Sequence, residues 1–410
     1  MKIETYYEMY RLIRQDCYLD CLKEVQEKNL RRIRAQKKIR IAFQSSCLAE
    51  WVGDALVRKF AENERFDVTV VIVWQVNTDF DKEIPALIEH FEQSGLPYRL
   101  SDGSVKPGDF DIVFYTSPYM EILSHWLDRD IPLSTLVCYI PYGFYLADIQ
   151  KMQFNLFAHH ICWKNFTLAK GYDIMAERYS DIGAYGMVYA GYPKLDGLLD
   201  PACADRAAWK IAGKGPVRKI IFAPHHSIAE KPYYATFAAN HRFFLAYARA
   251  HGEDTSWVFK PHPMLGLSCV KNGVFSSLDE YDAYCRAWDA LPNAKVEMGE
   301  YLAYFASSDA MILDSASFMA EYLYVHKPAL FLTREGERFN EFGEMVASLL
   351  YRASGTDYAA IEHFLDVLIE RDPMKDAREN FFRQVLDYAA EHRKSATQFI
   401  YDDIVCSIGV

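Results

Sequence analysis

The stretch "AMILDSASFMAEYLYVHKPALFL", residues 310–332, decides the predicted fold. It opens with an apolar run typical of a buried strand and breaks on the small polar residues "DSAS". A helical pattern follows, and after Lys327-Pro328 a second apolar run begins. A strand, a tight turn, a helix and another strand make up the repeating unit of a parallel sheet covered by helices. The stretch therefore predicts an α/β fold.

The same alternation runs through the rest of the chain. Short apolar runs, separated by helical patterns, are strand candidates at residues 39–46, 67–75, 98–100, 110–117, 134–143, 159–165 and 187–193, and again at 219–227, 256–263, 294–299, 310–317 and 328–332. Between the two sets lies "GLLDPACADRAAWKIAGKGPVRK", residues 197–219, which is rich in Gly, Pro and charge and is expected to be a hinge. Each set predicts one doubly wound, Rossmann-like domain.

The expected domain organisation has four parts. They are an N-terminal helical segment at 1–38, a Rossmann-like domain at 39–197, a second Rossmann-like domain at 216–375, and C-terminal helices at 376–410. In doubly wound sheets, ligands bind outside the carboxyl ends of the strands. Two such domains predict a central cleft between them, with the functional residues where strands stop.

The composition excludes several classes of protein. Of 410 residues, 51% are hydrophobic and 25% charged, as in a soluble globular protein, and a net charge of −11 argues against binding to nucleic acid. The nine cysteines form no CxxC pair, which indicates a reducing compartment. We find no apolar run of the ~18 residues that a membrane span needs, and no apolar signal-peptide core at the N-terminus. We therefore expect a cytoplasmic protein.

One basic stretch is a candidate for contact with a membrane. Lysines and arginines crowd residues 28–40. They indicate either a solvated helix end or a contact with anionic lipid or with a polyanionic acceptor.

The turn at "DSAS" is the first candidate binding site. A helix that starts here presents unpaired amides, and the hydroxyls of Ser315 and Ser317 lie beside them, so Asp314 to Ser317, including Ala316, form a pocket suited to phosphate. The alternative is that Asp314 or Ser315 only caps the helix. Glu321, four residues past Ser317, could accept hydrogen bonds from ribose hydroxyls or could be a solvated helix residue.

Histidines follow two other strands. His225, His226 and Ser227 end one strand, and Lys260 and His262 end the next. Such side chains can donate to phosphate oxygens or move a proton, although each histidine could also be an ordinary buried hydrogen-bonding residue. Because the two adjacent histidines should point in different directions, we expect at most one of them to face a reacting group. No acidic residue completes a zinc-like ligand set, so no metal is expected.

The order "APHHS", "KPHP" and "LDSASFMAEYLYVHKPALFL" resembles the C-terminal domain of the CDP-glycerol glycerophosphotransferases, the teichoic acid polymerase-like family, which has a glycosyltransferase-B (GT-B) type fold. Upstream, "AGYPKLDGLL", residues 190–199, is similar to that family's Gly-x-Pro-Arg-x-Asp segment. There, Lys194 stands at the arginine position and Asp196 at the aspartate position. The resemblance covers roughly residues 135–335.

The resemblance implies an acceptor domain at 39–197 and a nucleotide-donor domain at 216–375. It implies that Ser315 and Ser317 bind phosphate, that His262 and Lys260 stabilise charge, and that Glu321 holds ribose or polyol hydroxyls. The implied reaction moves a polyol phosphate from a CDP-activated donor to a cell-surface polysaccharide or lipid-linked glycan, releases CMP and requires no cofactor. Such phosphoryl transfer asks mainly for positioning and charge neutralisation.

One departure concerns the acceptor. Where the family commonly carries Trp-His-Gly-Thr, residues 138–148 read "CYIPYGFYLAD", so Gly143 keeps the turn but Tyr142 replaces the histidine. A tyrosine with a pKa of ~10 is a poor base at neutral pH. The remaining candidates for the base are His225, His226 and Asp148, whereas the apolar flanks of His159 and His160 favour a core role.

Two other functions remain open. A GT-B glycosyltransferase or a nucleotide-sugar 2-epimerase would use similar phosphate-binding turns. A non-catalytic nucleotide-binding scaffold is the non-enzymatic alternative.

Overall fold

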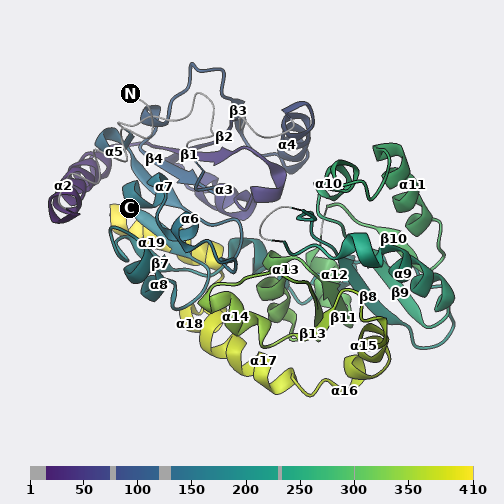
Figure 1. Cartoon of the computed structure of the whole chain (residues 1–410). Coiled ribbons are helices and arrows are strands. Elements are labelled where there is room, and N and C mark those ends of the chain that lie inside the picture. The colour runs from purple at the N-terminus through teal and green to yellow at the C-terminus, as the bar shows by residue number, and fades with distance from the viewer. Residues whose placement is uncertain (1–14, 74–79, 120–130, 230–232, 300, 410) are drawn as a thin grey trace. The chain divides into compact units, whose positions relative to one another are not determined.

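The computed structural model describes residues 15–73, 80–119, 131–229, 233–299 and 301–409 (Figure 1). The chain divides into two compact units, each with its own parallel sheet. Unit 1 consists of Met1–Phe144, Gln150–Asp196 and Val385–Val410, and unit 2 of Tyr145–Ile149 and Gly197–Gln384. The predicted α/β class with two doubly wound sheets is confirmed.

The sheet of unit 1 has seven parallel strands in the order β3-β2-β1-β4-β5-β6-β7. The chain builds outward from β1 to β3 and then continues on the other side of β1, so the strand order reverses between β1 and β4. The strands are β1 (Ile39–Ser45), β2 (Phe66–Ile72), β3 (Tyr98–Leu100), β4 (Ile112–Tyr115), β5 (Leu136–Tyr139), β6 (Lys164–Thr167) and β7 (Met187–Tyr189). The residues of β1, β2, β4, β5 and β6 are almost all buried, as expected for a sheet covered on both faces, whereas the edge strands β3 and β7 contain no buried residue.

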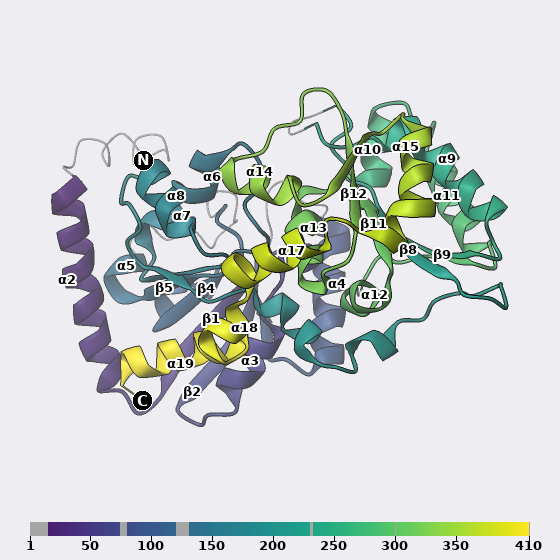
Figure 2. The same ribbon diagram turned by 90° about the horizontal axis from the view of Figure 1, so that it is seen from below.

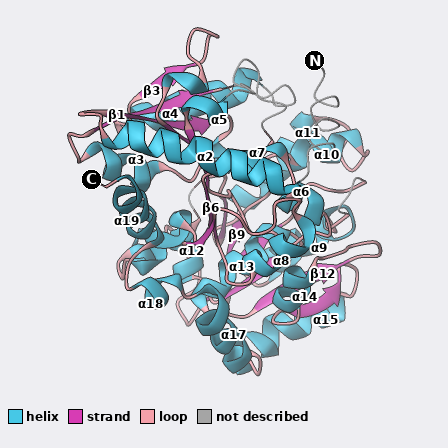
Figure 3. Ribbon diagram, turned by 90° about the vertical axis from the view of Figure 1, so that its left-hand side faces the viewer, coloured by secondary structure: helices cyan, strands magenta, loops and turns pink. Residues whose placement is uncertain are grey.

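Helices cover this sheet. They are α2 (Gln15–Arg34), α3 (Asp54–Ala61), α4 (Phe80–Ser94), α5 (Ile131–Ser134), α6 (Gln150–Phe154), α7 (Phe157–Ile161), α8 (Tyr172–Tyr179), α18 (Tyr388–His392) and α19 (Ala396–Ile408). Helix α2 packs along α5 and β5 (Figure 3), and α19 lies against α3 and α2 (Figure 2). The aromatic rings of Phe43 on β1 and Phe114 on β4 stack 4.5 Å apart in the core.

Part of the basic stretch near residue 34 has a structural role. The carboxylate of Asp111 is fully buried and pairs with Arg32 at 2.5 Å and with Arg40 at 3.4 Å. Although burial opposes it, these hydrogen bonds lower the pKa of Asp111. Arg34 donates to the carbonyl oxygen of Ser407 in α19. These three arginines therefore hold unit 1 together. Of the helix predicted over 1–38, residues 15–34 form α2, residues 35–38 are not helical, and residues 1–14 lie outside the described part of the chain.

The strand predicted at 159–165 is wrong in its first half. Residues 157–161 form α7, and the strand begins only at Lys164. His159 and His160 are buried in that helix, where His159 Nδ1 accepts the backbone N–H of Leu156 and His160 Nε2 contacts Asn155 Oδ1. Both are core residues.

The sheet of unit 2 has six parallel strands in the order β10-β9-β8-β11-β12-β13. Here the order reverses between β8 and β11. The strands are β8 (Arg218–Ala223), β9 (Thr255–Phe259), β10 (Ala294–Val296), β11 (Ala310–Leu313), β12 (Ala329–Thr333) and β13 (Tyr351–Ser354). The last of these was not expected from the sequence, because its residues are only partly buried and are mostly polar.

The helices of unit 2 complete its two layers. They are α9 (Phe237–Ala250), α10 (Leu265–Lys271), α11 (Leu278–Asp289), α12 (Leu302–Ser307), α13 (Ala316–Glu321), α14 (Glu341–Ala347), α15 (Tyr358–His363), α16 (Ile369–Arg371) and α17 (Lys375–Phe381). The core is aromatic: the ring of Phe259 on β9 lies 5.7 Å from Phe222 on β8 and 5.3 Å from Trp288 on α11. The segment predicted as C-terminal helices, 376–410, is helical but is shared between the two units.

Candidate active site

The candidate site lies at the carboxyl ends of β8, β9 and β11 in unit 2. His225 and His226 follow β8, Lys260 and His262 follow β9, and the serine turn follows β11. Since β8 pairs with both β9 and β11, the three strand ends are neighbours. The position between β8 and β11 is the switch point of this sheet, where ligands of doubly wound folds bind.

Asp314 ties two of these loops together. Its carboxylate is buried and accepts the backbone N–H of His225 at 2.5 Å, the backbone N–H of Thr236 at 2.5 Å and the hydroxyl of Thr236 at 2.7 Å. Burial raises the pKa of Asp314 to about 6, against the effect of these hydrogen bonds. The predicted phosphate-binding Asp314 is therefore a positioning residue, because its oxygens are turned into the protein.

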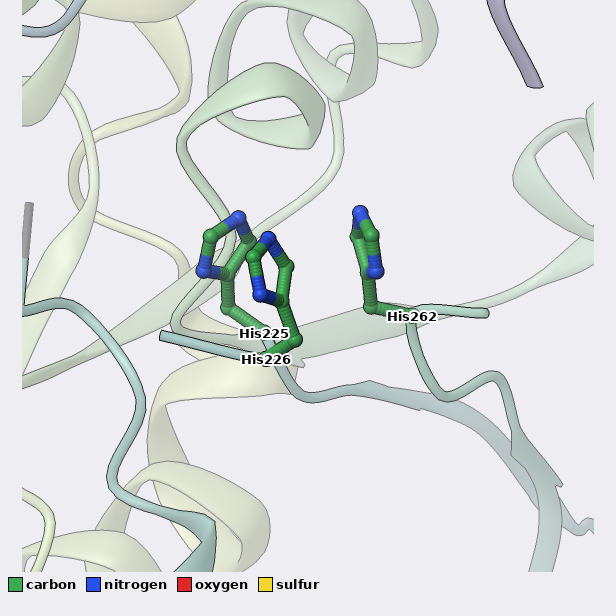
Figure 4. A group of neighbouring side chains, drawn as sticks. All are labelled: His225, His226 and His262. Atoms are coloured by element: carbon green, nitrogen blue, oxygen red, sulfur yellow. The ribbon is translucent and has the colours of Figure 1, made fainter. Parts of the chain in front are cut away.

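The three histidines form one cluster. The centroid of the His226 ring lies 4.4 Å from that of His225 and 4.3 Å from that of His262, and the His225 and His262 rings are 5.2 Å apart. Figure 4 shows the rings side by side and pointing the same way. The expectation that the two adjacent histidines point apart is wrong, because β8 ends at Ala223 and strand alternation no longer applies.

Local hydrogen bonds define how two of these rings carry their protons. The Nδ1 atom of His225 accepts the backbone N–H of Ser227 at 3.2 Å and lies 2.9 Å from its hydroxyl, and Nδ1 of His262 accepts the backbone N–H of Met264 at 3.1 Å. In a neutral imidazole, an accepting Nδ1 leaves the proton on Nε2. Both rings therefore present an Nε2–H donor.

Both rings are neutral at physiological pH. Burial, together with the neighbouring His226 and His262, lowers the pKa of His225 well below its usual value. Burial, His226 and the Lys260 ammonium lower the pKa of His262 to about 3. The cluster therefore offers neutral N–H donors, which suit phosphate oxygens.

A metal ion is the alternative to an anion as the ligand of this cluster. One ring nitrogen of each histidine lies within 4.8 Å of the others, which is close enough for shared ligation. Ligation uses a nitrogen lone pair, and the other ring nitrogen then normally donates its N–H to an acceptor. At His225 and His262, Nδ1 faces backbone donors instead. The arrangement fits an anion better than a metal.

Lys260 supplies the positive charge. The residue is buried, and its ammonium group donates to the carbonyl oxygens of Gly299 at 3.1 Å and Glu297 at 3.4 Å. It also lies 5.6 Å from the centre of the Tyr301 ring. The Tyr301 hydroxyl in turn donates to Glu321 at 2.6 Å. Glu321 is thus a buried residue linked to the lysine through Tyr301, and not a solvated helix glutamate.

The serine turn has the predicted order of strand, turn and helix, but the helix is short. Ser315 stands at the N-cap of α13 with extended backbone, and its hydroxyl makes no capping hydrogen bond. The alternative in which Ser315 merely caps the helix through its side chain is therefore not observed. Ser315 is 9% exposed, Ala316 is half-buried and Ser317 is exposed. Amides at the start of a helix have no partner within the helix.

The residues predicted for the acceptor fall in different parts of the fold. Tyr142 and Gly143 lie in the turn after β5 of unit 1, where the Tyr142 carbonyl accepts the hydroxyl of Tyr192. Asp148 belongs to the short segment Tyr145–Ile149 that clusters with unit 2. Lys194 lies half-buried in the 3₁₀ segment Pro193–Leu199.

Asp196, the other residue of the Gly-x-Pro-like segment, has an identifiable structural partner. Its carboxylate accepts the hydroxyl of Tyr388 and the backbone N–H groups of Ala396 and Thr397, each at 2.8 Å. It therefore anchors the start of α19 within unit 1.

Three residues acquire roles that sequence reasoning missed or assigned otherwise. Thr236 and Tyr301 were not singled out, although Thr236 directly precedes α9 and could have been noted as a capping residue. Tyr301 carries no motif signal. Ser227, predicted to bind phosphate, is fully buried and accepts the backbone N–H of Tyr234 while it holds the His225 ring. It positions the histidine.

One protein family matches more than half of the chain. The sequence model described as CDP-Glycerol:Poly(glycerophosphate) glycerophosphotransferase matches residues 171–405. No curated protein sequence matches the chain.

Several solved structures share the fold. A variant of the wall teichoic acid polymerase TagF superposes with a TM-score of 0.58 at 13% identity, covering 100% of this chain and 98% of that one. The TagF variant soaked with CDPG gives 0.55 at 13% identity, with coverage of 100% and 99%. An enzyme described as a UDP-N-acetylglucosamine 2-epimerase from Listeria monocytogenes gives 0.52 at 14% identity, with coverage of 84% and 91%. At these identities the likeness shows the fold.

Proposed function

Since the chain belongs to the CDP-glycerol:poly(glycerophosphate) glycerophosphotransferase family, we propose that it transfers a polyol phosphate, such as glycerol phosphate, from a CDP-linked donor to a hydroxyl group of a cell-surface polymer. The observation that carries the proposal is the histidine cluster at the switch point of unit 2, in which the neutral His225 and His262 lie near the strand end that carries Lys260. It combines uncharged donors with one cation, which suits a pyrophosphate.

The proposed chemistry is an in-line displacement at the phosphorus that carries the polyol. The acceptor oxygen forms a bond to this phosphorus, the bond to the bridging oxygen breaks, and CMP leaves with that electron pair. The Nε2–H groups of His225 and His262 and the ammonium group of Lys260 stabilise the charge on the phosphates. Ser315, Ser317 and the first amides of α13 bind the phosphate oxygens, and Glu321 accepts hydrogen bonds from sugar or polyol hydroxyls.

The reaction also needs a base that takes the proton from the acceptor hydroxyl. His225 and His262 are poor proton acceptors at neutral pH because burial lowers their pKa values. Tyr142 is a poor base at neutral pH because a tyrosine hydroxyl, with a pKa of ~10, keeps its proton. Of the candidates named from the sequence, His226 and Asp148 remain. The proposed reaction requires no cofactor.

The proposed setting is the cytoplasmic face of a membrane. All nine cysteines are free thiols, in keeping with a reducing compartment. Among the described residues, no helix combines the length and the apolar composition that crossing a membrane requires. Exposed basic residues of the stretch 28–40, such as Lys37 and Lys38, would provide a peripheral contact with anionic lipid.

The experiment that tests the proposal separates three outcomes. The purified chain is incubated with CDP-glycerol or UDP-N-acetylglucosamine together with a short glycerol phosphate oligomer, and the nucleotides released are measured. Release of CMP from CDP-glycerol supports the transferase. Conversion of the UDP-sugar to its 2-epimer would favour the second candidate, which the fold of the bacterial epimerases suggests. Binding without turnover would indicate a scaffold.

A further inference from the structure

A short piece of the turn expected on the acceptor side is built into unit 2. The stretch 138–148 stands where the family carries Trp-His-Gly-Thr, but it belongs to unit 1 only as far as Phe144. The following segment, Tyr145–Ile149, groups with unit 2 and carries the exposed Asp148. One of the two remaining candidates for the base is therefore part of the unit that holds the histidine cluster.

Asn340 holds this segment through two hydrogen bonds. Its backbone N–H donates to the carbonyl oxygen of Leu146 at 2.8 Å, and its side-chain Nδ2 donates to the carbonyl oxygen of Tyr145 at 2.9 Å. Asn340 is buried, and its Oδ1 accepts the backbone N–H of Gly343 at 2.8 Å, which caps the first turn of α14. Because the cap fixes the side chain of Asn340, the amide Nδ2 faces the segment in one orientation.

Gly343 allows the segment to approach the start of α14 closely. A Cβ atom at this position would clash with the carbonyl oxygen of Leu146 and would lie 2.9 Å from Cβ of Phe339. Any larger residue would therefore push the segment away, and glycine is the residue that permits such a close approach of two backbones. Ala147 also pairs with Phe339 in an isolated antiparallel bridge. The segment is thus held at one place by a side chain, by the missing Cβ of a glycine and by a backbone bridge.

Two aromatic rings connect the held segment to the histidine cluster. The rings of Phe339 and Tyr234 are stacked with their centroids 5.3 Å apart, and the Tyr234 ring lies 5.9 Å from the ring of His225. Burial raises the pKa of Tyr234, and so do the charges of Glu337 and Asp148, so the carboxylate of Asp148 is close enough to act on the Tyr234 hydroxyl. Asp148 therefore lies on the side of unit 2 that carries the histidines.

We propose that Asn340 is a positioning residue that, together with Gly343, fixes the segment Tyr145–Ile149 within unit 2 so that Asp148 takes the proton of the acceptor hydroxyl. This inference rests on the proposed function. The acceptor oxygen bonds to the phosphorus, its proton passes to the Asp148 carboxylate, and CMP leaves with the electron pair of the broken bond. An aspartate accepts the substrate hydroxyl proton in the same way in protein kinases. The competing explanation is that Asn340 only caps α14 and that His226 is the base.

The test measures CMP release by the full chain from CDP-glycerol, with a glycerol phosphate oligomer as the acceptor. The variant Asn340→Asp keeps a side-chain oxygen for the N–H of Gly343, so α14 stays capped, but it turns an oxygen instead of an N–H group toward the carbonyl of Tyr145. The matched control is Asp357→Asn, because Asp357 caps α15 in the same way through the N–H of Ala360. This control exchanges the same two groups, in the opposite sense, at a helix start that does not hold the segment.

The expected result is a loss of turnover without a loss of donor binding. The kcat for CMP release should fall roughly 10- to 100-fold in Asn340→Asp, because a small misplacement of a catalytic group can cost that much, and at least ~100-fold in Asp148→Asn. The dissociation constant of CDP-glycerol, measured by calorimetry without acceptor, should not change. The variant with both substitutions should be no slower than Asp148→Asn alone, because Asn340 acts through Asp148. Asp357→Asn should match the unmodified chain.

Hydrogen exchange tests the held segment independently of turnover. The amides of residues 145–149 should exchange faster in Asn340→Asp and in Gly343→Ala, which changes no charge, but not in Asp357→Asn. Unchanged exchange would overturn the proposal, and so would rate losses that multiply in the double variant or that arise from weaker donor binding. If the unmodified chain releases no CMP, the proposed function and the role of Asp148 fail together, whereas the exchange rates still decide whether Asn340 holds the segment.

Discussion

In the His262→Ala variant, kcat/KM for CMP release from CDP-glycerol should fall roughly 30- to 150-fold, because a neutral donor to a charged phosphate is worth about 2 to 3 kcal/mol. The structure supports a loss of this size. Nδ1 of His262 is occupied by the N–H of Met264, so Nε2–H is the one donor that the ring can offer a ligand. Because that ring packs 4.3 Å from His226, its removal also loosens a neighbour.

The assay compares three variants by coupled detection of CMP. His262→Gln retains an N–H donor on a more flexible side chain and should recover part of the loss. His363→Ala removes an exposed histidine at the end of α15 and should leave the rate unchanged. Because burial lowers the pKa of His262 to about 3, its protonation should not shape the rate near neutral pH. A rate for His262→Ala within twofold of the unmodified enzyme would refute the reasoning. So would a rate-limiting ionisation near pH 6.5 that disappears in this variant.

Three further outcomes are expected. Asp314→Asn places an amide N–H where three donors converge, and should lower the free energy of unfolding by about 2 to 3 kcal/mol in urea titrations. An unchanged urea midpoint would contradict the role of Asp314 in joining the loops after β8 and β11. The pKa of His262 is about 3 in the folded chain and 6.5 in the unfolded chain, so between these pH values only the unfolded chain binds the proton. The free energy of unfolding should therefore decrease as the pH falls below about 6.5, and His262→Gln should remove part of that decrease. The same pH dependence of the urea midpoint in the variant and the unmodified chain would contradict this expectation. Changing Lys37 and Lys38 to Gln should weaken sedimentation of the protein with anionic vesicles at low salt. Stability should not change, since neither lysine pairs with Asp111 as Arg32 does. Equal sedimentation of the variant and the unmodified chain would argue against a lipid contact of this stretch.

The predicted strands in both units follow from strong local signals. Runs such as residues 66–72 and 310–313 are largely apolar because parallel strands are buried on both faces, so the sequence alone indicates them. The run predicted as a strand at 67–75 ends as a strand at Ile72, and its residues 74–75 lie outside the described part of the chain. The errors occur where that signal is weak. A short apolar run at 159–165 could be helix or strand by periodicity, and β13 is a half-exposed strand with little apolar content.

The candidate site was predictable in its position and only partly in its roles. Polar residues that directly follow strands pointed to the carboxyl edge of the second sheet. No local pattern indicated that Asp314 and Ser227 face inward, since their partners are decided by the packed loops. Nor did it reveal Tyr301, which links Lys260 to Glu321.

By itself, the sequence determined the alternation of elements, the two sheets and the polar turns at the strand ends, because these depend on neighbouring residues. Only the tertiary structure decided which side chains meet. The contact of Asp314 with His225 spans 89 positions and that with Thr236 spans 78, so both arise from strand order and register.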